Sequence, residues 1–390
     1  MRTNKLFIFL LLAFFLTEWL PENAGGETPP ALKKPRPEIA LPEIMSWTTY
    51  DVGSSGYVQA AAIGDAFTRK KGIKLRVLPA GTDISRAMPL KMGVADFSLA
   101  GIGCYFAWQG IHDFASFEWG PQQLRQVWQV LPNGMPAATA ADAQIKTPRH
   151  LKGKRVAWIP GNPSINIAHE AFMAFAGYTW NDVQKVIFPS FGSAGKGLIE
   201  NTNDVMMCTG TSAFLYELEA SRRGLYWPEF PASDKEGWAR LSKVAPYFFP
   251  DLIAEGPGIA KDHPRELPNY AYPALVCYPN KDENVVYALA KAIYETYDVY
   301  KNVNLSMKGW EMKKAIRPPG MVPYHKGSIR FFMEVGVWSR ELDEWNNKAL
   351  ESEKEIMNAW AKAKKEAIEK RVPAKDFSKS WMRSRGVTVD

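Results

Sequence analysis

Two loops of small residues carry the groups best suited to hold a ligand. They are Gly53-Ser54-Ser55-Gly56 and Gly161-Asn162-Pro163-Ser164, and each lies between a predicted strand and a predicted helix. The first N–H groups of a helix have no partner inside the helix, and the helix dipole is positive at that end. Small residues let an anion approach those donors, and serine hydroxyls add neutral donors. The pair of loops therefore predicts a site for an anion such as a carboxylate. The alternative is that Ser55 and Ser164 simply cap their helices.

The sequence offers no comparable set of catalytic groups. No two of the five histidines have the spacing that binds a metal on a helix, and the three cysteines supply no zinc site. Ser193 lies in Gly-Ser-Ala-Gly, which is not the nucleophile-elbow pattern, and there is no phosphate-binding loop. We therefore expect a binding protein rather than an enzyme, with no catalytic residue, cofactor or metal.

The three cysteines are far apart in the chain. Cys208 follows Met206 and Met207, and Cys277 follows an apolar pair. This context predicts buried free thiols, with a single disulfide as the alternative.

Short apolar runs alternate with longer amphipathic runs along the chain. Strands are predicted at residues 44–48, 74–78, 97–100, 126–131, 137–141, 154–159, 183–188, 205–208 and 274–278. Helices are predicted at residues 57–69, 84–92, 165–176, 195–201, 283–300 and 329–371. This rhythm favours sheets flanked by helices. Residues 226–250, rich in aromatic residues and proline, are expected to form an irregular surface insertion.

The rhythm breaks near residue 140 and then repeats, which predicts two lobes. We expect residues 43–137 and 274–390 to form lobe I and residues 138–273 to form lobe II. The strand at 274–278 would return the chain to the first lobe. The last helix carries one apolar stripe, which predicts a side that packs on the core. The stripe consists of Leu342, Trp345, Ala349, Ile356, Trp360, Ala363 and Ala367.

The start of the chain has the order of a secretory signal. Arg2 and Lys5 precede an unbroken apolar run at residues 6–16, and the small residues 24–26 follow. The run is too short to cross a bilayer core of about 30 Å as a helix. We expect a cleavable signal peptide at residues 1–25, a flexible proline-rich leader at 26–42 and a location in the periplasm. A retained membrane anchor is the alternative.

The charge balance bears on the partners of the protein. The formal net charge is +7, and the basic residues are scattered along the chain rather than clustered. Nucleic-acid binding calls for a clustered basic surface, so we expect no nucleic-acid partner.

Five blocks of the sequence, in this order, resemble the TAXI family of extracytoplasmic solute receptors, which serve TRAP-type secondary transporters. The blocks are residues 53–57, 78–110 (LPAGTDISRAMPLKMGVADFSLAGIGCYFAWQG), 151–177 (LKGKRVAWIPGNPSINIAHEAFMAFAG), 188–211 and 318–324 (PPGMVPY). The resemblance implies an α/β, two-lobed periplasmic-binding-protein type fold, in which each lobe is a mixed sheet flanked by helices; the long C-terminal helix and the insertion at 226–250 exceed a compact member of the family. The sequence differs from the family at residues 50–52 and 101–103.

The resemblance also implies a ligand between the lobes. From the first lobe it implies Ser54, Ser55, Gly56, Tyr57, Thr82 and Tyr105, and from the second Asn162, Ser164, Asn166, Thr209 and Thr211. Tyr57 and Tyr105 are expected to stack on an organic ligand. Arg86 either pairs with a carboxylate of the ligand or lies on a solvated helix face.

The function that follows from the resemblance is solute capture. We expect a periplasmic receptor that takes a small organic anion between its lobes and delivers it to the membrane permease subunits of a TRAP-type transporter. Two alternatives remain: a ligand-sensing module that signals to a membrane sensor, and an exported enzyme on the same scaffold.

Overall fold

The computed structural model describes residues 40–131 and 134–389. The predicted signal peptide lies outside the described residues, as does most of the predicted leader. Within the described ranges, no helix combines the length and the apolar character needed to cross a membrane.

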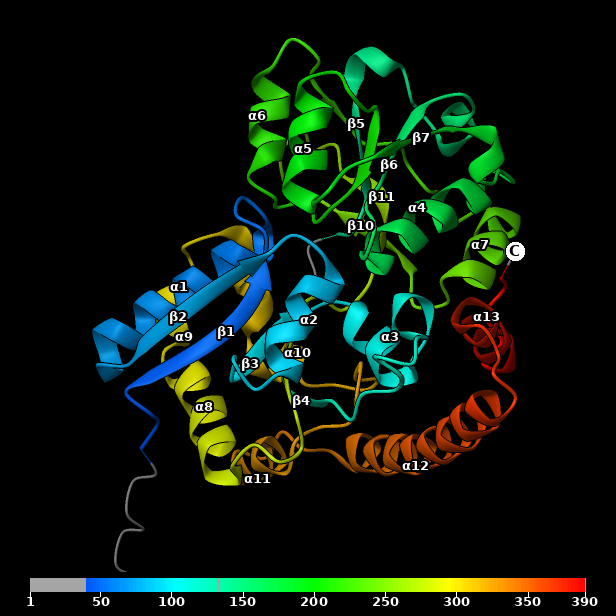
Figure 1. Ribbon diagram of the computed structural model, residues 1–390. Helices are drawn as coiled ribbons and strands as arrows, with labels where there is room; N and C mark the ends of the chain where they lie inside the picture. Colours follow the sequence, from blue (N-terminus) through cyan, green and yellow to red (C-terminus); the bar gives the residue numbers. More distant parts are fainter. Residues whose placement is uncertain (1–39, 132–133, 390) are drawn as a thin grey trace, which may run out of the picture. The chain divides into compact units, whose positions relative to one another are not determined.

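The first sheet has five strands in the order β2-β1-β3-β12-β4 (Figure 1). Its strands are β1 Ile44–Tyr50, β2 Lys74–Ala80, β3 Phe97–Ala100, β4 Arg125–Gln129 and β12 Ala274–Cys277. The first three run parallel, and β12 runs antiparallel to both of its neighbours. Residues on both faces of the central strands β3 and β12 are buried, whereas the edge strand β2 has no fully buried residue. We call this sheet and its helices lobe I.

Helices cover both faces of the first sheet. Helix α1 (Ser55–Lys71) and helix α8 (Glu283–Glu295) pack on one face, where Trp47 and Trp128 are buried. Helix α2 (Asp83–Lys91) and helix α3 (Gly103–Gln109) contribute to the core on the other face. Because the parallel strands β1, β2 and β3 each lead into a loop and then a helix, their ends place the first loop and the starts of α2 and α3 at one edge of the sheet.

The second sheet also has five strands, in the order β7-β6-β8-β5-β9. They are β5 Ala137–Ala140, β6 Arg155–Trp158, β7 Gln184–Ile187, β8 Val205–Met207 and β9 Leu225–Tyr226. Its helices are α4 Pro163–Phe175, α5 Phe191–Ile199, α6 Phe214–Ala220 and α7 Lys235–Val244. We call this sheet and its helices lobe II. Two mixed sheets flanked by helices confirm the predicted fold class.

The two sheets repeat one topology. In each, three parallel strands come first, and the fourth position is an antiparallel strand that arrives from the other lobe: β12 in lobe I and β5 in lobe II. The two crossing segments, one between β4 and β5 and one between β11 (Arg265–Asn269) and β12, hydrogen-bond to each other. The N–H of Val130 donates to Pro273 O at 3.0 Å, and the N–H of Met135 donates to Pro268 O at 2.9 Å. The lobes are thus joined by a paired connection.

The prediction of an irregular insertion at residues 226–250 is wrong. This part contains the end of β9, helix α7 and the start of β10 (Phe249–Ile253), which pairs with β11. Phe230 is fully buried, and its ring centroid lies 5.1 Å from that of Phe172 in α4. Four of the aromatic residues that marked this stretch, Trp227, Phe230, Trp238 and Phe248, are therefore core residues of lobe II. Phe230 and Trp238 pack on the aromatic rings of α4.

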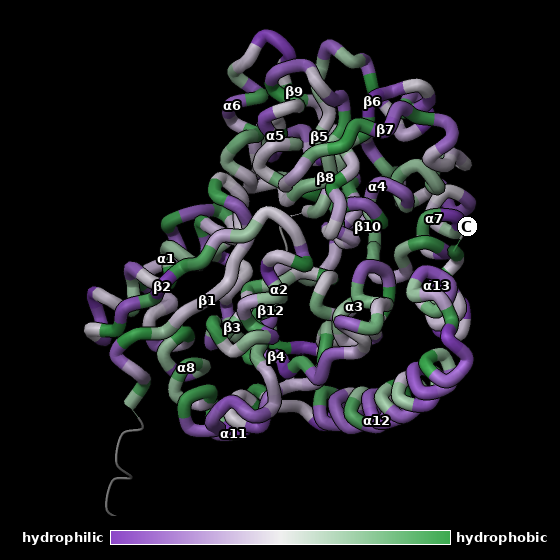
Figure 2. The backbone as a smooth tube through the Cα atoms, in the orientation of Figure 1, coloured by the Kyte–Doolittle hydropathy of each residue, from purple (hydrophilic) through white to green (hydrophobic). Residues whose placement is uncertain are grey.

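The C-terminal part consists of three helices rather than one. The chain forms α11 (Lys326–Glu334), α12 (Arg340–Glu369) and α13 (Ala374–Ser384). The predicted helix at 329–371 is interrupted because Gly336 has a φ of +70° and Ser339 caps a new helix, with its Oγ accepting from Leu342 N. The predicted apolar stripe of α12 is confirmed at its centre, where Ile356 and Trp360 are buried. Figure 2 shows hydrophilic residues over much of the rest of α12.

Shorter helices complete the described part of the chain. The α-helical ones are α9 Tyr297–Tyr300 and α10 Met312–Ala315, and the 3₁₀ ones are His112–Phe114, Ala141–Ala143, Pro148–Leu151, Trp180–Asp182 and Leu305–Trp310. The predicted helix at 283–300 is thus divided into α8 and α9. All three cysteines are buried and free, which confirms the prediction of unpaired thiols.

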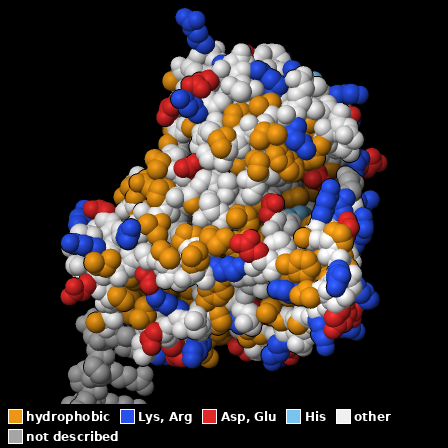
Figure 3. Space-filling view, viewed as in Figure 1, with side chains coloured by type: hydrophobic (Ala, Val, Ile, Leu, Met, Phe, Trp, Pro, Cys, Tyr) orange, Lys and Arg blue, Asp and Glu red, His pale blue; other side chains and the backbone are white. Residues whose placement is uncertain are grey.

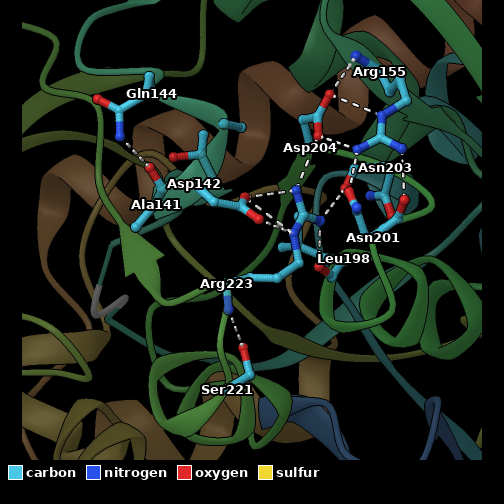
Figure 4. A network of polar contacts seen from close by, with 12 residues as sticks. Ala141, Asp142, Gln144, Arg155, Leu198, Asn201, Asn203, Asp204, Ser221 and Arg223 are labelled. Carbon is cyan, nitrogen blue, oxygen red and sulfur yellow. Dashed lines mark hydrogen bonds and ion pairs between the residues drawn. The ribbon is translucent and has the colours of Figure 1, made fainter.

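A polar network fastens the strand ends of lobe II (Figure 4). Arg223, just before β9, donates to both carboxylate oxygens of Asp142, to Asp204 and to the carbonyls of Leu198 and Asn203. Burial by itself raises the pKa of Asp204, but hydrogen bonds from two arginines hold it below its usual value. The network joins the segments that lead into β8 and β9 to the one that follows β5.

Candidate functional site

A pocket lies where the two lobes and the second crossing segment meet. Its polar and aromatic lining consists of Tyr50 and Ser54 from lobe I, Asn162, Ser164, Phe191 and Thr209 from lobe II, and Tyr270 and Tyr272 from the crossing segment. Within the described chain, no charged side chain lines it. Two other pockets contain no residue of lobe II. One is a cavity inside lobe I, lined by Arg86 and Cys104 among others, and the other is an open hollow near Lys281. The pocket between the lobes is therefore the candidate site.

Tyrosines form one wall of the pocket. The ring centroid of Tyr272 lies 5.2 Å from that of Tyr50 and 6.2 Å from that of Tyr270. Burial raises the pKa of all three hydroxyls, so each stays neutral and able to donate a hydrogen bond. A Cβ on Gly101 would lie 2.8 Å from the hydroxyl of Tyr50, and one on Gly56 would lie 2.3 Å from the same ring. Only glycine at these two positions leaves room for the Tyr50 side chain in the wall.

The first predicted loop has a different arrangement from the one expected. Ser54, not Ser55, caps α1: its Oγ accepts from Tyr57 N at 3.2 Å and donates to Asp51 O at 2.6 Å. The Oγ of Ser55 accepts from Gln59 inside lobe I. The N–H groups of Ser55 and Gly56, at the start of α1, have no hydrogen-bond acceptor in the described ranges. This end of α1 keeps free donors next to the pocket.

The second predicted loop leaves one hydroxyl unused. Asn162 is the residue before α4, and its side chain makes no cap hydrogen bond. The Oγ of Ser164 is buried without a hydrogen-bond partner in the described structure, although it lines the pocket. Ser164 therefore does not cap α4 with its side chain, contrary to the alternative considered from the sequence. Its unpaired hydroxyl is available to a ligand.

Carboxylates of lobe I lie on the first turns of two helices in lobe II. Asp83 Oδ2 accepts from Ser164 N at 2.8 Å, at the start of α4. Asp51 Oδ2 accepts from Gly192 N at 3.0 Å, at the start of α5. The N-termini of α4 and α5 thus bind carboxylates of the protein itself, and only α4 belongs to the predicted pair of loops.

Arg86 is buried, with only 3% of its surface exposed, and it forms an ion pair with Asp83. Its guanidinium carbon lies 3.8 Å from the centroid of the Tyr50 ring. The alternative that Arg86 lies on a solvated helix face is wrong, because α2 turns this side chain into the interior of lobe I, against Asp83 and the Tyr50 ring.

The lobes also touch through backbone and hydroxyl hydrogen bonds. Thr211 Oγ1 donates to Ser55 Oγ at 2.8 Å, so these two predicted residues are used in the contact. The N–H of Phe191 donates to Gly81 O, and the N–H of Ala213 donates to Gly53 O. The described structure is consequently one in which the lobes are closed on each other.

The other predicted residues divide between the pocket and the scaffold. Thr209 lines the pocket, with its hydroxyl 2.8 Å from that of Ser212. Thr82 caps α2 by accepting from Ser85 N. The amide of Asn166 is engaged with both backbone groups of Ile159, in the interior of lobe II.

The two tyrosines expected to stack on the ligand do not line the pocket. Tyr105 packs on Trp108 within α3, with ring centroids 5.8 Å apart, and Tyr57 follows the cap of α1. The aromatic wall comes instead from Tyr50, Tyr270 and Tyr272, which sequence reasoning missed. The available signal in the sequence was the pair Tyr270 and Tyr272, which are separated by one residue and lie just before β12.

Metal-binding groups and charged surfaces complete the description. In residues 40–131 and 134–389, no group of three or more His, Cys, Asp and Glu side chains is close enough to hold a metal. His169 is buried, and its Nε2 accepts from Met207 N, which gives it a structural contact. Figure 3 shows acidic and basic side chains interspersed over the visible face.

Comparison with known proteins identifies a family. The model of the NMT1-like family matches residues 48–336, which include the whole pocket and, apart from the first residues of β1, both sheets. Among curated proteins, no relative matches the chain by sequence.

Solved structures share parts of the fold at low identity. The alkanesulfonate-binding protein SsuA from Xanthomonas axonopodis pv. citri bound to MOPS is 14% identical, with 79% of this chain and 84% of that chain covered and a TM-score of 0.43. The periplasmic aliphatic sulphonate-binding protein SsuA from Escherichia coli is 15% identical, with 78% and 83% covered and a TM-score of 0.42. An amino acid ABC transporter substrate-binding protein from Streptococcus pneumoniae bound to L-arginine is 14% identical, with 70% and 93% covered and a TM-score of 0.39. These TM-scores are low, so no property of those proteins is carried over to this chain.

Because the family model spans most of the chain, from β1 to the end of α11, this protein belongs to the NMT1-like family.

Proposed function

We propose that this protein is a periplasmic solute receptor that captures a small organic anion between its two lobes. The observation that carries the proposal is the pocket itself, which is lined by both lobes and by a crossing segment and contains a buried, unpaired hydroxyl at Ser164. A ligand that touches both lobes favours the closed state over the open one, because only such a ligand has different affinities for the two states.

The pocket contains donors for an anion without a cation in its lining. The free N–H groups of Ser55 and Gly56 lie at the positive end of a 17-residue helix. The unpaired hydroxyl of Ser164 adds a donor from lobe II, whereas the hydroxyls of Tyr50 and Tyr272 already hydrogen-bond to each other. The apolar body of the ligand would pack on Phe191 and the tyrosine rings. The pocket of the closed structure has a volume of only about 30 Å³, so a carboxylate carried on an apolar molecule would enter only with the lobes further apart.

The crossing segments provide the hinge in this proposal. We place the lobe boundaries at residues 137–138 and 273–274, at the lobe II and lobe I ends of the paired connection. Bending of the paired connection would separate α1 from α4 and open the pocket. No disulfide joins the two lobes, since all three cysteines are free, so only the chain itself links them covalently.

Delivery to the permease subunits of a TRAP-type transporter is the part of the proposal that rests on the TAXI-family resemblance. Location in the periplasm rests on the secretory signal at the start of the sequence. A sensing module and an exported enzyme remain as alternatives. Binding is favoured over catalysis, because neither Ser164 nor Cys208 has a histidine or carboxylate bonded to its hydroxyl or thiol in the described residues, and burial raises the pKa of the Cys208 thiol.

A thermal-shift screen with organic anions tests the proposal. A ligand at about one hundred times its Kd stabilises the folded state by about 2.7 kcal/mol, which corresponds to a rise in Tm of about 4 °C for a chain of this size. Ser164→Ala should weaken the binding of a positive ligand about tenfold, because it removes one hydrogen bond of about 1.4 kcal/mol. Ser328→Ala is the matched control, since Ser328 is also a buried, unpaired hydroxyl but does not line the pocket. Equal loss in both variants would refute the assignment of the pocket.

A further inference from the structure

We propose that Asp83 is a built-in anion that determines ligand specificity: its carboxylate holds the anion position at the start of α4, so the ligand of this protein carries a single anionic group. The inference rests on the proposed function for the identity of the ligand as an anion. The occupation of the position by Asp83 is argued from the structure alone.

The position has the components of a complete anion site. One oxygen of Asp83 accepts from the N–H of Ser164, and the other is paired with Arg86. The side chains of Asp83 and Arg86 are 2% and 3% exposed, so both charges are removed from water. Helix α4 has 13 residues, and the site lies at the positive end of its dipole. A carboxylate in this place is held by a helix terminus and a buried guanidinium together.

The position has no room for a second anion. A Cβ added to Gly103 would lie 2.8 Å from the carboxyl carbon of Asp83 and 3.0 Å from the hydroxyl of Ser164. The start of α3 therefore closes the site against Asp83 itself. The positive charge of Arg86 is already balanced, so a second carboxylate placed here would meet the negative charge of Asp83 in a medium of low dielectric constant.

The unpaired hydroxyl of Ser164 separates the two anion positions. Its N–H serves Asp83, while its Oγ belongs to the pocket and has no partner in the described ranges. An anionic group of the ligand is therefore left the Ser164 hydroxyl and the free N–H groups at the start of α1, but not the backbone N–H of Ser164. A ligand with two carboxylates, one for each lobe, would require Asp83 to leave.

Asp51 provides a matched control within the same interface. It also gives a carboxylate oxygen to a helix N-terminus of lobe II, at Gly192 N. It differs from Asp83 because it is partly exposed and forms no ion pair in the described structure. Removal of Asp51 leaves no buried cation behind, so the resulting space has little affinity for a small anion.

Formate is the probe, because it is a carboxylate small enough to replace the one that Asp83→Ala removes. Thermal denaturation is measured with increasing formate, with chloride to keep the ionic strength constant. The Tm of Asp83→Ala should rise with formate and saturate, whereas the wild type and Asp51→Ala should show no saturable rise. A folded Asp83→Ala that does not respond to formate, or a wild type that responds equally, would overturn the proposal.

A second variant covers the case in which Asp83→Ala fails to fold because Arg86 is left unpaired. Refolding yield of Asp83→Ala should then increase with formate, and no increase would count against the proposal. The double variant Asp83→Ala/Arg86→Met removes both charges, so it should not respond to formate. If formate acts on Asp83→Ala while no organic anion stabilises the wild type, the built-in anion stands and the proposed function fails. If an organic anion stabilises the wild type but formate has no effect on Asp83→Ala, the proposed function stands and the built-in anion fails.

Discussion

Replacement of Arg223 by methionine tests whether the network of lobe II holds that lobe together. The side chain of Arg223 is 7% exposed, and its guanidinium gives two hydrogen bonds of 2.7 Å to the carbonyls of Leu198 and Asn203. Methionine fills a similar volume but leaves both carbonyls without these donors. Each unsatisfied buried group costs about 1–3 kcal/mol, and a buried ion pair that loses one partner costs about 3–5 kcal/mol. Because Asp204 keeps Arg155 and Asp142 reaches water, we expect a loss of about 4 kcal/mol in the free energy of unfolding.

Urea unfolding, followed by tryptophan fluorescence and by circular dichroism, measures this loss. Arg155→Met is the control, because Arg155 also binds Asp204 but its side chain is 31% exposed, and we expect a loss of about 1.5 kcal/mol. Arg223→Lys keeps the charge but not the forked geometry, and should lie between the two. The reasoning is refuted if Arg223→Met costs about 1 kcal/mol or less, or no more than Arg155→Met.

Two further predictions concern the pH dependence and the tyrosine wall. Burial lowers the pKa of His169 to about 3, so below the usual value of about 6.5 the unfolded state binds a proton that the folded state does not. Stability should therefore fall with decreasing pH, and His169→Gln should remove about 2 kcal/mol of the loss between pH 6.5 and pH 5, as measured by urea unfolding at both values. Gly101→Ala places a methyl group 2.8 Å from the Tyr50 hydroxyl, and should cost about 1–3 kcal/mol and weaken ligand binding in calorimetry. Unchanged stability and affinity in Gly101→Ala would show that the wall adapts.

Local sequence patterns were sufficient for most elements of the fold. The strand at 97–100 was predicted with the bounds that the structure shows, and the other predicted strands agree within two residues. Strand alternation and helical periodicity are properties of neighbouring residues, so they can be recognised without the fold. Element ends were less predictable. The break between α11 and α12 depends on the left-handed conformation of Gly336, and the aromatic residues of 226–250 became ordered only because they pack on α4.

The sequence also indicated where the site lies, but not which atoms form it. Both small-residue loops are at the contact between the lobes, and four of the predicted residues line the pocket: Ser54, Asn162, Ser164 and Thr209. The tyrosine wall was missed because it unites the end of β1 with a segment more than two hundred residues later in the chain. No local pattern reports such a contact.

The sequence by itself therefore determined the two α/β lobes, the free cysteines and the pair of loops with helix N-termini behind them. Only the tertiary structure decided which donors remain for a ligand. Asp83 and Ser164 are 81 residues apart, and their hydrogen bond exists because the two lobes close on each other. Whether a helix terminus is free or occupied depends on the side chain that packs against it, and packing between distant segments is not encoded in the spacing of neighbouring residues.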